Sequence, residues 1–195
     1  MISEENQYLL LTIARLAIET GLKSPGTHYS PDHERLPEEL KKNGAAFVTL
    51  ELDNRLRGCI GSLEAYRPLA QDVAANAYAA AFSDPRFVPL SLREFNQLHV
   101  SISILTEPVP MHVESEQDLL QQLQPGKDGL ILEAGHHRGT FLPSVWESLP
   151  SPLLFVQQLK RKAGLAESYW SDEVKISRYH TQSFSCDIEE ISQTA

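Results

Sequence analysis

Residues 56–61, with the sequence LRGCIG, hold the side chains that are best suited to chemistry. Side chains alternate between the two faces of a β-strand, so we expect Arg57, Cys59 and Gly61 on one face. Two residues along a strand span about 7 Å between Cα atoms, which brings the guanidinium near the thiol. Such a neighbour would favour the nucleophilic thiolate of Cys59. Gly61 would leave space beside the sulfur for a ligand or another backbone.

The same segment also allows a purely structural interpretation. A free cysteine is often only a small buried hydrophobe, and residue types alone favour this interpretation over a nucleophile. Gly58 and Gly61 could accommodate a β-bulge or a tightly packed helix. If Arg57 is buried, its charge needs compensation, which the nearby acids Glu51 and Asp84 could supply.

Three polar side chains outside this segment are candidates for substrate contacts. Asn76 interrupts an apolar helical stripe, and its buried amide must find partners, either in a neighbouring loop or in a ligand near Cys59. Asp84 and Arg86 could bind a polar substrate. The alternative is a turn in which Asp84 accepts hydrogen bonds from backbone amides while Arg86 pairs with an acid.

The histidines give weaker signals. His99 lies on the polar face of its strand and could act as a general base only if that face meets Cys59. The adjacent His136 and His137 point apart on an extended chain, so we expect an exposed hairpin tip and neither a metal nor a cofactor. The predicted site thus has Arg57 and Cys59 as catalytic residues and, as substrate contacts, Gly58, Gly61, Asn76, Asp84 and Arg86.

An antiparallel sheet is predicted to position these residues. Residues 45–52 and 55–63 alternate as strands around the turn signal Asp53-Asn54, which indicates a hairpin. A third strand, 98–105, alternates clearly. Pro68 suits the first turn of an alanine-rich helix that runs to about Phe82 and packs on this sheet.

The remaining elements mix helices and strands without regular β-α-β alternation. Ser3 can cap a helix over 3–20 that Gly21 ends, a long surface loop follows over 24–37, and Ser91 to Glu94 forms a capping box. Further elements are expected at 115–123, 129–133, 140–142, 151–164 and 173–186. The pattern favours an α+β fold with a mainly antiparallel sheet and room for a small second lobe.

Composition limits the function classes. The 195-residue chain has a net charge of −9, which argues against broad binding to a phosphate backbone, and its hydrophobic fraction of 42% is typical of a globular domain. Lys160, Arg161 and Lys162 end a helix, where the helix dipole favours cations without nucleic acid. Only two cysteines are present, which suggests a reducing cytoplasm. We expect no signal peptide, because no basic segment precedes the apolar residues near the N-terminus, and no apolar run is long enough to span a bilayer.

Several blocks of the sequence resemble the signature of the AMMECR family. They are FVTL at 47–50, LRGCIG at 56–61, NA at 76–77, AA at 80–81, DPRF at 84–87, DGLIL at 128–132, GTFLP at 139–143 and KAGL at 162–165. Each block alone is a weak signal, but together, in this order, they cover nearly the whole chain. The region around 184–186 is less typical of the family, so no role is carried over to it.

The resemblance implies a single AMMECR-type domain over 1–195, with an α+β fold, in a cytoplasmic bacterial protein. It also implies partners, because the AmmeMemoRadiSam system joins such proteins to Memo-like proteins, which resemble extradiol dioxygenases, and to radical SAM enzymes. It implies no settled reaction. Within the family signature, the block around Arg-Gly-Cys resembles an active site, which the resemblance places at Arg57, Gly58, Cys59 and Gly61.

Two functions follow as hypotheses. The first is an enzyme or small-molecule-binding protein with a pocket at Cys59, whose thiolate attacks a carbonyl or an electrophilic ring. Its substrate would come from a base- or metabolite-modification pathway shared with the implied partners. The second is a non-catalytic adaptor for those partners, with an exposed apolar patch and an inert, buried Cys59.

Overall fold

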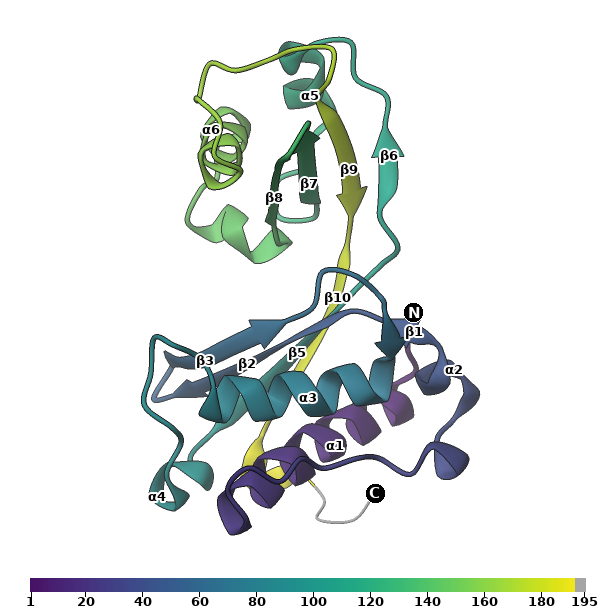
Figure 1. The fold of residues 1–195 in the computed structure, drawn as a ribbon, viewed down its shortest axis with the longest axis vertical. Helices are drawn as coiled ribbons and strands as arrows, with labels where there is room; N and C mark the ends of the chain where they lie inside the picture. Colours follow the sequence, from purple (N-terminus) through teal and green to yellow (C-terminus); the bar gives the residue numbers. More distant parts are fainter. Residues whose placement is uncertain (192–195) are drawn as a thin grey trace. The chain divides into compact units, whose positions relative to one another are not determined.

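The chain folds into two compact units, each with a hydrophobic core of its own, in a computed structural model that describes residues 1–191. Unit 1 comprises Met1–Leu105 and the segment from Gln182 onward, and unit 2 comprises Thr106–Thr181. Each unit contains an antiparallel sheet and helices (Figure 1). The α+β class predicted from the sequence is therefore confirmed.

The sheet of unit 1 has the strand order β10-β5-β2-β3. Its strands are β2 (Ala46–Leu52), β3 (Arg55–Gly61), β5 (His99–Leu105) and β10 (Thr181–Asp187). Asp53 and Asn54 have positive φ angles of 49° and 59°, as a two-residue hairpin turn requires. The predicted hairpin and its third strand are confirmed, and β3 lies at the edge of the sheet.

Two long helices cover one face of this sheet (Figure 1). They are α1 (Glu4–Lys23), capped by Ser3, and α3 (Leu69–Phe82), which Pro68 precedes as expected. The prediction that α1 ends before Gly21 is wrong. A Cβ at Gly21 would lie 2.4 Å from the Phe82 ring, so this glycine lets α1 and α3 pack closely inside the helix.

The segment between α1 and the sheet runs back alongside the helices of unit 1 (Figure 1). It is irregular over most of the expected loop 24–37, apart from a 3-10 turn at His33–Arg35. The short helix α2 (Glu38–Lys41) follows, and then a two-stranded ribbon of β1 (Asn43–Gly44) and β4 (Arg67–Pro68). The ribbon positions Arg67 just before α3. Farther along, the expected capping box of Ser91 and Glu94 starts α4 (Leu92–Phe95).

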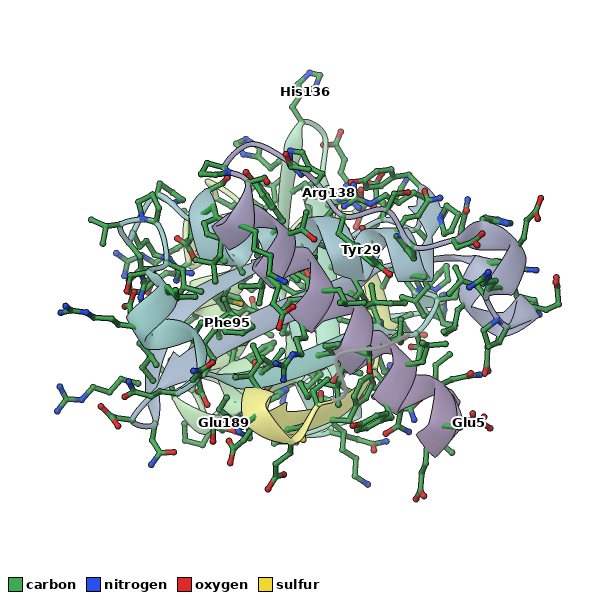
Figure 2. The ribbon with its side chains drawn as sticks, turned by 90° about the horizontal axis from the view of Figure 1, so that it is seen from below. Glu5, Tyr29, Phe95, His136, Arg138 and Glu189 are labelled. Carbon is green, nitrogen blue, oxygen red and sulfur yellow. The ribbon has the colours of Figure 1, made fainter. Side chains whose placement is uncertain are left out.

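Unit 2 has a sheet of order β6-β9-β7-β8. Its strands and helices are β6 (Val109–Met111), α5 (Glu116–Gln122), β7 (Gly129–Ala134), β8 (His137–Phe141), α6 (Pro152–Lys162) and β9 (Lys175–Tyr179), with a 3-10 turn at Pro143–Glu147. Trp146 stacks on Phe155 at 3.9 Å between ring centroids. The β7–β8 turn is tighter than predicted, and His136 projects from its tip (Figure 2).

In the part of the chain that the structure describes, every helix is too short or too polar to cross a membrane.

Candidate functional site

A β-bulge at Arg57 interrupts the alternation on which the predicted site was based. Leu50 pairs with Gly58, whereas the next residue, Glu51, pairs with Leu56, so Arg57 is an extra residue in β3. A bulge shifts side chains relative to strict alternation. The expectation that Arg57 and Cys59 share a face from spacing alone therefore does not hold across this register shift.

Arg57 is instead bound to the α4 region. Its Nε donates to Glu94 Oε1 at 2.7 Å and its Nη2 donates to the Val88 carbonyl at 2.9 Å. This pairing lowers the pKa of Glu94 to about 2. Neither Glu51 nor Asp84 is an ion-pair partner of Arg57 among residues 1–191, and its buried Nη1 has no hydrogen-bond partner there. Arg57 is thus a buried, compensated charge that links β3 to α4.

Cys59 lies at the outer edge of the sheet, and two side chains cap its backbone. Its N–H donates to Asp84 Oδ2 at 2.9 Å, and its carbonyl accepts from Arg86 Nη2 at 3.2 Å. Both backbone groups therefore point away from β2, and the pair of Cys59 with Thr49 is a non-hydrogen-bonded one, whose side chains lie closer together. The Thr49 hydroxyl donates to Cys59 Sγ at 3.2 Å.

Asp84 and Arg86 form one rigid ion pair. Arg86 donates from Nε to Oδ1 at 3.0 Å and from Nη2 to Oδ2 at 2.7 Å. The Arg86 hydrogen bond is the main cause that lowers the pKa of Asp84 far below its ordinary range. Asp84 in turn raises the pKa of Arg86, with a smaller contribution from Cys59. The pair matches the structural alternative and also protects a strand edge, while 53% of the Arg86 side chain stays exposed.

The two glycines of the segment make room for neighbours in the protein. A Cβ at Gly58 would lie 2.1 Å from the carbonyl oxygen of Ala80, so α3 packs directly on this strand. A Cβ at Gly61 would lie 2.2 Å from the Phe47 ring. The space that was expected to admit a ligand beside the sulfur is filled at Gly61, because the cross-strand aromatic ring covers the glycine.

Asn76 belongs to a separate buried cluster. Its Nδ2 donates to the Ala46 carbonyl at 3.0 Å and to Asp72 Oδ2 at 3.0 Å. Asp72 is fully buried and also accepts from Ser62 Oγ at 2.6 Å and from Arg67 Nε at 2.8 Å. Asn76 therefore ties α3 to the sheet, as its tether alternative proposed. Sequence reasoning missed Asp72, although an acid four residues before Asn76 on the same helix face was a visible signal.

The face of the unit 1 sheet opposite α1 and α3 carries a row of polar side chains. Strand register aligns Cys59, Thr49 and Ser101 across three strands. Further polar residues on this face are Ser103, bonded to Ser183, and His99, whose Nδ1 lies 2.7 Å from Asp187 Oδ1.

His99 shares this face with Cys59 but does not reach it. It pairs with Glu51, while Cys59 pairs with Thr49 on the far side of β2. Strand spacing then separates the Cα atoms of His99 and Cys59 by about 10 Å or more. A direct general-base role for His99 at the sulfur is not supported by this register.

Within the described range 1–191, no group of three or more histidine, cysteine or acidic side chains is arranged to hold a metal ion. His137 Nδ1 lies 2.9 Å from the Ala163 carbonyl. This histidine therefore connects β8 to the end of α6.

Comparison with known proteins matches the chain to one family. The AMMECR1 family model matches residues 11–184. A protein of Methanothermobacter thermautotrophicus is 36% identical over 189 residues, covering 94% of this chain and 95% of that protein. A protein of Saccharolobus islandicus is 40% identical over 178 residues, covering 88% and 77% respectively. The crystal structure of the uncharacterized protein PH0010 from Pyrococcus horikoshii is similar with a TM-score of 0.85 and 32% identity, covering 94% of this chain and 93% of that one. The chain therefore belongs to the AMMECR1 family.

Proposed function

We propose that unit 1 binds a small electrophilic molecule at the sheet face opposite α1 and α3 and that Cys59 attacks it as a nucleophile. The observation that carries this proposal is the hydrogen bond from the Thr49 hydroxyl to Cys59 Sγ at 3.2 Å. A donor aimed at sulfur interacts more strongly with a thiolate than with a thiol. Cys59 is half-buried and is not one of the buried residues that form the core of unit 1.

The chemistry is addition to a carbonyl carbon or an electrophilic ring. The thiol gives its proton to solvent, and sulfur forms a bond to carbon. The π electron pair of the carbonyl moves to oxygen, which then takes a proton from water. Arg86 donates to the Cys59 carbonyl and keeps about half of its side chain exposed, so it is a cation that could stabilise the developing oxyanion.

The test is the rate at which iodoacetamide alkylates each cysteine as pH is raised, followed site by site by mass spectrometry. We expect Cys59 to be alkylated in the folded protein, and faster than Cys186 at neutral pH, because its sulfur accepts the Thr49 hydroxyl. Thr49→Val, which keeps the shape, should slow this alkylation, while Ser103→Ala on the same face serves as the control. Labelling of Cys59 only after unfolding, or equal rates in Thr49→Val and the unaltered protein, would contradict the nucleophile.

Cys186 is an internal control in the same experiment. Burial and the hydrogen bond to Glu190 raise the pKa of the Cys186 thiol. Its alkylation at neutral pH should therefore be slow in both variants.

A second candidate function is docking of a partner protein. Three apolar side chains are exposed around Arg57: Leu56 at 43%, Val88 at 77% and Leu92 at 73%. Their segments are held together because Arg57 follows Leu56 and binds both Val88 and Glu94. The partners to test are the Memo-like and radical SAM proteins that the family resemblance implies.

Docking is tested with Val88→Asp and Leu92→Asp in a binding measurement against a purified Memo-like protein. Loss of binding in these variants, while Cys59→Ser binds as tightly as the unaltered protein, would favour the adaptor function over the enzyme. Binding that survives both aspartates would exclude this patch as the interface.

A further inference from the structure

A pocket of ≈ 250 Å³ lies between the segment that follows α1 and the first half of α3. Its polar lining comes from His28, Tyr29, Ser30, Arg67 and Gln71, and alanines of α3 complete the wall. None of these residues is in the Cys59 site. The pocket is therefore a second candidate binding site, separate from Cys59.

Arg67 is held in this pocket by the buried cluster beneath it. Its Nε donates to Asp72 Oδ1 at 2.8 Å, its Nη2 lies 3.5 Å from Asn76 Oδ1, and its guanidinium is 4.8 Å from the Tyr66 ring centroid. These contacts fix the orientation of the Arg67 guanidinium, which would be variable in a free surface arginine. Its side chain is 27% exposed, so donors remain that can face a ligand.

The charge around Arg67 limits the ligand. The fully buried Asp72 already offsets the positive charge of Arg67. A phosphate dianion would bring two negative charges against an arginine that is already neutralised. A single carboxylate suits the guanidinium better, because the two groups can form parallel hydrogen bonds.

Three of the other polar groups of the pocket, those of Tyr29, Ser30 and Gln71, are neutral donors. Burial and the charge of Asp32 raise the pKa of Tyr29, so its hydroxyl keeps its proton at neutral pH. Ser30 adds a hydroxyl and Gln71 an amide. Neutral donors stabilise a monoanion without adding charge.

We infer that this pocket binds a small carboxylic acid as its monoanion, with the carboxylate on Arg67 and with Tyr29 and Gln71 as further donors. The residues come from two segments that are distant in sequence, and the ordered cluster of Asp72 and Asn76 preorganises the arginine. This site is independent of the chemistry proposed at Cys59.

The experiment is a titration of the 15N-labelled full-length protein with sodium benzoate, followed by amide chemical shifts. We expect saturable shifts at the residues of this pocket. Benzamide, the neutral isostere, and inorganic phosphate should bind at least about tenfold more weakly, since neither supplies a monoanionic carboxylate. Benzamide or phosphate binding as tightly as benzoate would overturn the inference, as would shifts that do not saturate.

Variants locate the site. Gln71→Ala and Tyr29→Phe should each weaken benzoate binding about 3- to 10-fold, the effect of one lost hydrogen bond. Gln121→Ala removes an exposed glutamine of α5 and should leave the affinity unchanged. Neither pocket variant removes a member of the buried Asp72 cluster, so both should keep the fold, which the same spectra check. Unchanged affinity in both pocket variants would exclude this site.

Discussion

At the scale of single residues, Asp84 connects the edge of the sheet to Arg86. Its carboxylate accepts the backbone N–H of Cys59 and two donors of Arg86. Asp84→Asn keeps the size but removes the charge, and should lower the free energy of unfolding by about 1–3 kcal/mol. Urea unfolding measures this change, and the exposed Asp172→Asn serves as the control. A loss no greater than that of the control would contradict the role of Asp84.

The same carboxylate makes stability depend on pH in acid. Arg86 lowers the folded-state pKa of Asp84, so this contribution is fully present above the unfolded value of about 3.9. It is lost as pH falls below that value toward the folded pKa. The stability difference between the unaltered protein and Asp84→Asn should therefore shrink steadily on acidification, as urea unfolding at each pH would measure. A constant difference would contradict this linkage.

Residue types predicted some of these contacts and missed others for a physical reason. The Asp84 turn and the Asn76 tether follow from local hydrogen-bonding needs, which a sequence exposes. The partner of Arg57 does not, because the bulge shifts the register of β3. Nor does the filled space at Gly61, since a glycine alone does not reveal that Phe47 lies across it.

At the scale of elements, the packing of α3 on β3 depends on Gly58. An added Cβ would meet the Ala80 carbonyl at 2.1 Å, which is helix backbone and cannot rotate away. Gly58→Ala should destabilise unit 1 by about 1–3 kcal/mol or more through overpacking. At Gly61 the three atoms nearest to an added Cβ all belong to the half-buried Phe47 ring, so Phe47→Ala should rescue Gly61→Ala. We therefore expect a larger drop in melting temperature for Gly58→Ala than for Gly61→Ala, measured by thermal unfolding. Equal drops for the two variants would contradict this prediction.

A buried ion pair joins α5 and α6. Lys160 is fully buried and pairs with Glu116 at 2.7 Å. The helix dipole alone therefore does not explain why basic residues occupy positions 160–162. Glu116→Gln leaves the ammonium buried without a counter-charge and should cost about 3 kcal/mol or less, since Glu116 is partly exposed. Lys160→Met should cost less. A melting temperature lower for Lys160→Met than for Glu116→Gln would contradict this account, and Arg161→Met, at an exposed pair, is the control.

At the scale of the whole molecule, pairing between distant strands was the part that the sequence could not reveal. The two terminal strands were expected, and β9 and β10 confirm them, but they belong to different sheets although one residue separates them. Period-two alternation marks a strand without naming its partner. The family match spans both units, while the single module predicted over 1–195 remains a prediction.

The two separate cores predict that the units open independently. Leu159 is fully buried in the core of unit 2 and Ile102 in that of unit 1. Replacing either by alanine should cost about 2–5 kcal/mol in its own core. Native-state hydrogen exchange reports local opening, so Leu159→Ala should lose protection mainly in β7 and β9. Ile102→Ala should lose protection mainly in β2 and β5. Equal loss of protection in both sheets for either variant would mean that the chain unfolds as one cooperative unit, despite its two cores.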